Sequence, residues 1–155
     1  MHITDSNVVL IATDFSPLSQ RAADRAADLA NRLGAELRFV HVVEPIEDPD
    51  TADPETRAFH EELLEKARAH LQAELERVSA TRAEAVALLG PRALTLLNLS
   101  QQVQPVMLVM GSSMREYPSN HQAGISLQVL VQANVPVLCV PAVESLVETR
   151  ATVLG

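Results

Sequence analysis

The amino-acid sequence predicts a single α/β domain in which helices cover both faces of an open parallel sheet. Five short apolar runs of strand length alternate strictly with four helical patterns, so the order is β-α-β-α-β-α-β-α-β. Crossovers of this length imply right-handed connections and a doubly wound sheet. The length of 155 residues fits one domain. We expect this domain to span residues 1–141, followed by a C-terminal tail at residues 142–155.

The predicted strands are apolar runs of five to seven residues. The first and fourth runs are apolar on both faces, as expected for central strands of a sheet with helices on each side. The five runs lie at residues 8–12, 37–43, 84–89, 106–110 and 135–140.

The first two helices have clear start signals. Ser16 followed by Pro17 predicts an N-cap with proline at the first helical position, and Gly34 ends that helix. Asp53 and Pro54 begin the second helix in the same way. The third and fourth helices are predicted at residues 92–102 and 126–133, each ending before a proline.

The second helix is expected to face the core with one apolar stripe, which consists of Phe59, Leu63, Ala67, Leu71, Leu75 and Val78. Glu62 and Lys66, four residues apart, form an exposed pair. The linker at residues 44–53 holds five acidic residues and is expected to be a mobile surface loop. Residues 44–77 carry 11 acidic and 4 basic residues, so most of the net charge of -8 lies here.

Composition excludes several classes of partner. With a net charge of -8, most of the surface repels the phosphate backbone of DNA or RNA. Aromatic residues make up 3% and tryptophan is absent, which removes the stacking platform that single-stranded nucleic acid needs. No apolar run has membrane-spanning length, and the first residues do not form a signal peptide. We therefore expect a cytoplasmic protein with no nucleic-acid or membrane partner.

The single cysteine, Cys139, has apolar neighbours at Leu138 and Val140. One cysteine cannot form an internal disulfide, so we interpret it as a buried thiol in a reducing compartment.

A ligand of such a sheet lies beyond the carboxyl ends of the strands, where the winding reverses. Two loops qualify by their content: residues 12–16 after the first strand, and residues 111–124 after the fourth. The second loop is longer than ordinary strand-to-helix connections, and long connections of this kind are often functional.

These loops and strands resemble the universal stress protein family over residues 8–141. The resemblance rests on five segments in the same order and spacing: VLIATDFS at 9–16, LGAEL at 33–37, VHVV at 40–43, LVMG at 108–111 and VPVLCVP at 135–141. It implies a five-stranded sheet of order 3-2-1-4-5, similar to the adenine nucleotide alpha hydrolase fold. That order places the reversal between the first and fourth strands, at the crevice chosen above.

Many members of that family bind ATP or another adenine nucleotide through a Gly-x-x-Gly-x9-Gly-Ser/Thr pattern. The resemblance places Gly111 and Gly124 at its first and third glycines, whereas Met114 replaces the second and Ile125 replaces the Ser/Thr. Ile125 has no hydroxyl, and the side chain of Met114 occupies space that the phosphate would need. The loss of one charge-assisted hydrogen bond removes roughly 1.5–3 kcal/mol, or one to two orders of magnitude in affinity. The branch with this degenerate motif is therefore expected to bind triphosphate weakly or not at all.

The resemblance also implies roles for four further residues. Asp14 corresponds to an acidic residue near adenine and ribose, or it shapes the turn before Ser16. The backbone of Val42 would meet the adenine edge. Arg115 either contacts phosphate or is solvated, and Ser126 either replaces the missing hydroxyl or caps the fourth helix. The candidate nucleotide site is thus Asp14, Val42, Gly111, Arg115, Gly124 and Ser126.

Metal and catalytic sites are not predicted. His60 and the two glutamates after it are consecutive and cannot converge on one ion from a helix. His70 and Glu74 are expected to form a surface pair. His121, in the long loop, is interpreted as solvated, with no acid or nucleophile to accompany it. Neither a Gly-x-Ser-x-Gly elbow nor a Walker loop is present, so we expect no enzyme and no phosphate transfer.

The last predicted strand and the residue after it, Val135 to Pro141, pair in the family with their own copy in a second chain. An unpaired strand with Val137, Leu138 and Val140 would be an exposed, sticky edge. Together with this edge, the resemblance implies a homodimeric stress-response protein that acts through contacts with a protein partner. The alternative is an ATP- or AMP-binding regulator that uses the crevice between the first and fourth strands.

Overall fold

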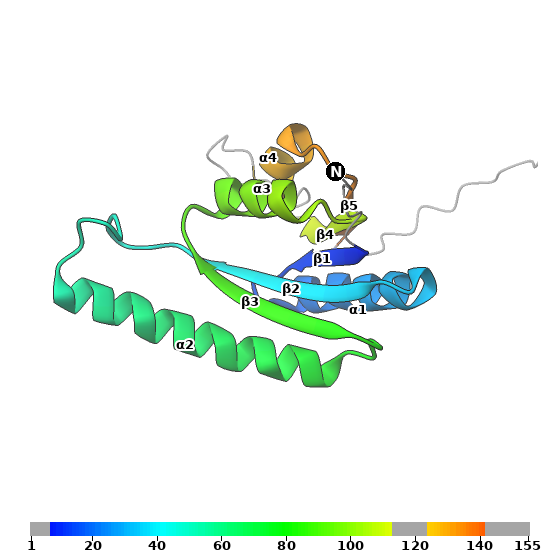
Figure 1. Ribbon diagram of the computed structural model, residues 1–155, viewed down its shortest axis with the longest axis horizontal. Coiled ribbons are helices and arrows are strands. Elements are labelled where there is room, and N and C mark those ends of the chain that lie inside the picture. The colour runs from blue at the N-terminus through cyan, green and yellow to red at the C-terminus, as the bar shows by residue number, and fades with distance from the viewer. Residues whose placement is uncertain (1–6, 113–123, 142–155) are drawn as a thin grey trace, which may run out of the picture.

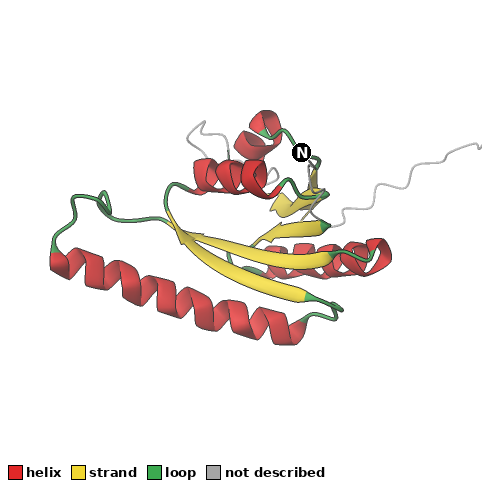
Figure 2. Ribbon diagram, in the orientation of Figure 1, coloured by secondary structure: helices red, strands yellow, loops and turns green. Residues whose placement is uncertain are grey.

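The computed structural model describes residues 7–112 and 124–141. Within them, five parallel strands form one sheet of order β3-β2-β1-β4-β5, which confirms the predicted fold class and strand order. Helices α1 and α2 cover one face of the sheet, and α3 and α4 cover the other (Figures 1 and 2). The elements are β1 Val8–Ala12, α1 Pro17–Leu33, β2 Glu36–Val43, α2 Pro54–Arg77, β3 Ala83–Leu89, α3 Arg92–Val103, β4 Met107–Ser112, α4 Ile125–Gln132 and β5 Val137–Pro141.

The central strand β1 is apolar on both faces because both are covered. Val9 and Ile11 are fully buried in the core beneath α1, while Leu10 is fully buried in the core beneath α3 and α4. β1 pairs in parallel with β2 on one side and with β4 on the other. The carboxyl ends of β1 and β4 therefore lie side by side at the edge where the winding reverses.

Helix α1 begins and ends where the sequence predicts. The Ser16 hydroxyl accepts a hydrogen bond from the Ser19 N–H, and Gly34 closes the helix with a left-handed φ of 63°. That conformation favours glycine because it has no Cβ. Five alanines at helical spacing are buried against the sheet, so the helix lies close to β1 and β4.

Helix α2 faces the core with most of the predicted apolar stripe, but not with Phe59. Phe59 is 42% exposed, whereas His60 and Leu64 are buried. Ala67 and Leu71 lie in the core as predicted. His60 can be buried because its Nε2 accepts the Ile46 N–H at 3.1 Å, which also ties the acidic 44–53 loop to the helix. The apolar pattern alone did not predict that His60 is buried, because the pattern does not reveal its hydrogen-bond partner.

Glu74 is also buried, so the predicted surface pair with His70 is wrong. Its Oε1 accepts hydrogen bonds from Arg77 Nε at 3.0 Å and from Gln20 Nε2 at 3.4 Å, and its Oε2 accepts from Arg77 Nη2 at 2.8 Å. Arg77 also reaches Asp24 of α1 at 2.7 Å. These contacts raise the pKa of the Arg77 guanidinium, mainly through Glu74. They join α1 to α2.

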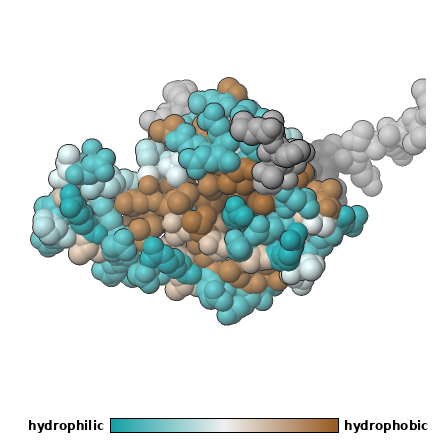
Figure 3. Space-filling view, in the orientation of Figure 1, coloured by the Kyte–Doolittle hydropathy of each residue, from teal (hydrophilic) through white to brown (hydrophobic). Residues whose placement is uncertain are grey.

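The two edges of the sheet are β3 and β5. Most residues of β3 are half-buried, and Figure 3 shows apolar surface over β2 and β3 beside the hydrophilic side chains of α2.

Cys139 on β5 is partly buried, and burial raises the pKa of its thiol. A protonated thiol is a poor nucleophile, in keeping with the structural role predicted for it. None of the helices in the described parts of the chain is long and apolar enough to cross a membrane.

Candidate functional site

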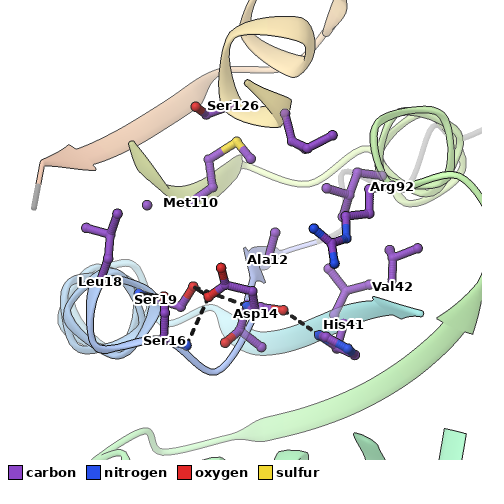
Figure 4. Close-up of a pocket in the computed structure, with 15 residues that line it drawn as sticks. Ala12, Asp14, Ser16, Leu18, Ser19, His41, Val42, Arg92, Met110 and Ser126 are labelled. Atoms are coloured by element: carbon purple, nitrogen blue, oxygen red, sulfur yellow. Dashed lines mark hydrogen bonds between the residues drawn. The ribbon is translucent and has the colours of Figure 1, made fainter. Parts of the chain in front are cut away.

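A cavity of about 290 Å³ opens at the carboxyl ends of β1 and β4, the position predicted from the winding of the sheet. Its walls come from β1 and the loop after it, β2, β4 and the first turns of α1, α3 and α4 (Figure 4). It is lined by Ala12, Thr13, Asp14, Ser16, Leu18, Ser19, Val40, His41, Val42, Arg92, Leu96, Met110, Gly111, Ile125 and Ser126. Four predicted residues, Asp14, Val42, Gly111 and Ser126, therefore share one cavity.

Asp14 lines the cavity and also shapes the turn before α1, so both predicted roles are compatible. Its Oδ1 accepts the Ser16 N–H at 2.9 Å and the Ser19 hydroxyl at 2.6 Å (Figure 4). Burial alone would raise the pKa of Asp14, but the hydrogen bonds from Ser16 and Ser19 outweigh it and hold the pKa below its ordinary 3.8. The carboxylate is consequently charged at neutral pH.

This depressed pKa predicts an acid-dependent loss of stability. A carboxylate with a lower pKa in the folded state stabilises the fold above its ordinary pKa and loses that contribution as the pH falls through the folded value. We expect the difference in unfolding free energy between wild type and Asp14→Asn to be constant near neutral pH and to shrink below about pH 4. Urea denaturation at a series of pH values measures it. A difference that stays constant down to pH 2 would contradict this assignment.

On β2, Val42 is buried and lines the cavity, as predicted. The neighbouring His41 was not predicted as a site residue. Its Nδ1 lies 2.7 Å from the Thr13 carbonyl oxygen, and because a carbonyl only accepts, Nδ1 carries the proton. A polar residue near the carboxyl end of an apolar strand was the sequence signal for it.

Gly111 ends up beside Leu18 of α1. A Cβ at this position would lie 2.6 Å from Leu18 Cγ. Packing between β4 and α1 therefore disfavours a side chain at this position.

Helix α4 begins earlier than predicted. Its N-cap is Gly124, with no side-chain cap hydrogen bond, so the prediction that Ser126 caps the helix is wrong. Ser126 instead lies in the first turn and is 4% exposed, with its side chain on the cavity wall. Ile125 lines the cavity too, at the position where the family pattern has a hydroxyl. Gly124 is not among the lining residues, and Arg115, like Met114 and His121, lies outside the described residues.

Arg92, the first residue of α3, was missed by sequence reasoning. Figure 4 shows its guanidinium extending from α3 toward β1 and β2. Its Nε lies 3.6 Å from a carboxylate oxygen of Glu44. A basic residue just after the carboxyl end of a parallel strand was the available signal, since such positions lie at the ligand-binding edge.

The cavity combines one carboxylate, one imidazole and one guanidinium with four hydroxyls, those of Thr13, Ser16, Ser19 and Ser126. Apolar residues, mostly aliphatic with Met110, and Gly111 form the rest of its wall. This arrangement suits a planar, polar ring with attached hydroxyl groups. Among the described residues, no group of three or more histidine, cysteine or acidic side chains is placed to hold a metal ion.

Comparison with known proteins places this architecture in a family. The model of the universal stress protein family matches residues 6–141. The structure is similar to that of universal stress protein UspA from Lactobacillus plantarum, at 20% identity and a TM-score of 0.69, covering 87% of this chain and 97% of that one. No curated protein matches the sequence significantly.

Two further similar structures were solved with nucleotides. One is a universal stress protein in complex with cAMP, at 24% identity and a TM-score of 0.63, covering 86% of this chain and 95% of that one. The other is the universal stress protein from Archaeoglobus fulgidus in complex with dAMP, at 21% identity and a TM-score of 0.57, covering 85% and 94%. At these identities the structures establish the fold, while the family match covers most of the chain. The chain belongs to the universal stress protein family.

Proposed function

We propose that this chain is a homodimeric stress-response protein that acts through protein contacts and binds nucleotide weakly or not at all. The observation that carries the proposal is Ile125, an apolar side chain on the cavity wall where the family's phosphate-binding pattern has a hydroxyl. The remainder of the crevice, with Asp14 and Val42, keeps the groups expected near adenine and ribose. The protein is proposed to work by binding rather than by catalysis.

A second candidate function is an ATP- or AMP-binding regulator. It is favoured by the open cavity at the β1/β4 edge and by the cAMP and dAMP complexes of similar proteins. In this reading Asp14 and Val42 hold adenine and ribose. The phosphates would meet Gly111, Arg115, Gly124 and Ser126.

Isothermal titration with adenosine, AMP and magnesium ATP separates the two candidates. The first proposal expects ATP to bind no more tightly than adenosine, because the phosphates lack a hydrogen-bond donor at Ile125. Saturable ATP binding in the submicromolar range, abolished in Gly124→Glu, would replace the first proposal with the second. If neither adenosine nor ATP produces heat, the second candidate fails and the first stands without a nucleotide.

The dimer is proposed to form through β5. This strand is an edge of the sheet, and its Leu138 is 38% exposed. Burying two such apolar edges against each other removes surface from water and pairs the free backbone groups.

A charge on this edge is expected to separate the protomers. Light scattering of the wild type should return about twice the mass of the 16.8 kDa chain, and Leu138→Lys should shift the dissociation constant upward by at least about tenfold. The matched control is Leu94→Lys, which places the same charge on exposed α3. A wild-type monomer at micromolar concentration, or equal effects of the two variants, would refute the β5 interface.

A further inference from the structure

A second cavity of about 300 Å³ lies on the α2 side of the carboxyl end of β2. It is lined from the β1–α1 loop, from β2 and the residue after it, from α2 and from the first residue of α3. His41, Val42 and Arg92 line both this cavity and the crevice described above. The two cavities are thus neighbours separated by a shared wall.

Three rings meet at the second cavity. The centroid of the Phe15 ring lies 4.5 Å from that of His41 and 4.9 Å from that of His70. Phe15 reaches this place with a φ of 65°, in the left-handed region that a bulky residue rarely adopts. A residue in this conformation persists only where the surrounding structure holds it, and such residues cluster at binding sites. Val43 and Leu63 extend the ring surface into an apolar floor.

The rim of the cavity is basic, in a chain whose net charge is -8. The lining residues include four basic side chains, those of Lys66, His70, His41 and Arg92. Glu44 is the one carboxylate among the lining residues. An apolar, ring-rich floor with cationic groups around it is suited to an anion that carries a flat apolar body.

The side chains of Lys66 and Arg92 carry permanent positive charges, and a ligand anion can replace the carboxylates that now pair with them. Lys66 Nζ lies 3.1 Å from Glu62 Oε1, and Arg92 Nε lies 3.6 Å from Glu44 Oε1. All four side chains are about half exposed or more, so these pairs contribute little to stability. A ligand anion can replace either carboxylate at small cost.

We propose that this second cavity binds a small aromatic acid, with its ring on the floor formed by Phe15 and Leu63 and its carboxylate or phosphate group between Lys66 and Arg92. The shared chemistry is a monoanionic or dianionic group attached to one planar ring. This site goes beyond the proposed adenosine crevice and does not depend on it, since Lys66, His70 and Leu63 line only the second cavity.

The test follows amide resonances of the full chain by ¹⁵N NMR during titration with benzoate, phenyl phosphate and inorganic phosphate. Saturable shifts at Phe15, Leu63 and His70 are expected with the two aromatic anions at millimolar concentration, and benzoate against phenyl phosphate identifies the preferred acid group. Inorganic phosphate should bind several-fold more weakly because it has no ring. Adenosine is titrated separately, and its shifts at Ile125 and Ser126 report on the first crevice alone.

Charge variants assign the anion to this rim. Lys66→Gln should weaken binding about threefold to fivefold, and Glu44→Gln should strengthen it by a similar factor. The control is Arg68→Gln, which removes the same charge from the same helix at a residue that does not line the cavity. Absence of saturable shifts with both aromatic anions, equal binding of inorganic phosphate, or equal weakening by Arg68→Gln would each overturn the proposal, whatever adenosine does.

Discussion

Replacing Arg77 with methionine is expected to lower the free energy of unfolding by about 2–3 kcal/mol. The substitution removes two hydrogen bonds to the Glu74 residue, which is 5% exposed, and leaves its carboxylate with the hydrogen bond from Gln20 Nε2 at 3.4 Å. A buried carboxylate without its cation keeps its desolvation cost and loses what offset it. The measurement is urea denaturation at neutral pH.

A matched variant separates this effect from general loss of charge. Arg32→Met breaks an exposed i,i+4 pair with Asp28, whose side chains are 75% and 55% exposed, and should cost less than about 0.5 kcal/mol. Adding Glu74→Gln to Arg77→Met should recover part of the loss, because a neutral amide costs less to bury. Equal destabilisation by Arg77→Met and Arg32→Met would contradict a buried α1–α2 network.

Gly111→Ala is expected to destabilise the fold by about 1–3 kcal/mol through overpacking. The added Cβ would lie 2.6 Å from Leu18 Cγ, so helix α1 or the Leu18 side chain must move. The double variant Gly111→Ala, Leu18→Ala should lose less than the sum of the two single variants, because the second change makes room for the first. Additive losses would show that Gly111 is retained for another reason, such as contact with a ligand.

The fold followed from the sequence because each element carries its own local signal. Ser16–Pro17 and Asp53–Pro54 begin helices where the N-cap chemistry predicts, and the apolar runs lie within one or two residues of the observed strands. The sheet order came from the family resemblance rather than from periodicity, and it is confirmed.

The exceptions depend on contacts between distant segments. His60 is buried since it accepts a backbone N–H from a loop 14 residues away, and Glu74 is buried since Arg77 and Gln20 pair with it. An apolar pattern cannot reveal these partners. For α4, the sequence offered Ser126 as a cap, but its side chain is used inside the domain.

The candidate site was predicted only in part. Asp14 and Val42 were identified because their segments resemble the family, and both line the cavity. His41 and Arg92 were not identified, because His41 lies on β2 and Arg92 begins α3, and they meet only when these elements are assembled. The predicted homodimer, the cytoplasmic location and the domain boundary at residue 141 stay predictions.

We propose that the crevice lacks a hydrogen-bond donor for phosphate at Ile125, where the family pattern has a hydroxyl. Titration of magnesium ATP into wild type, Ile125→Ser and Ile125→Ala tests it most directly. The serine variant should bind ATP about tenfold more tightly than wild type, because a hydroxyl returns, while alanine, which only removes bulk, should not. Submicromolar ATP binding by the wild type, or equal gains with serine and alanine, would contradict it.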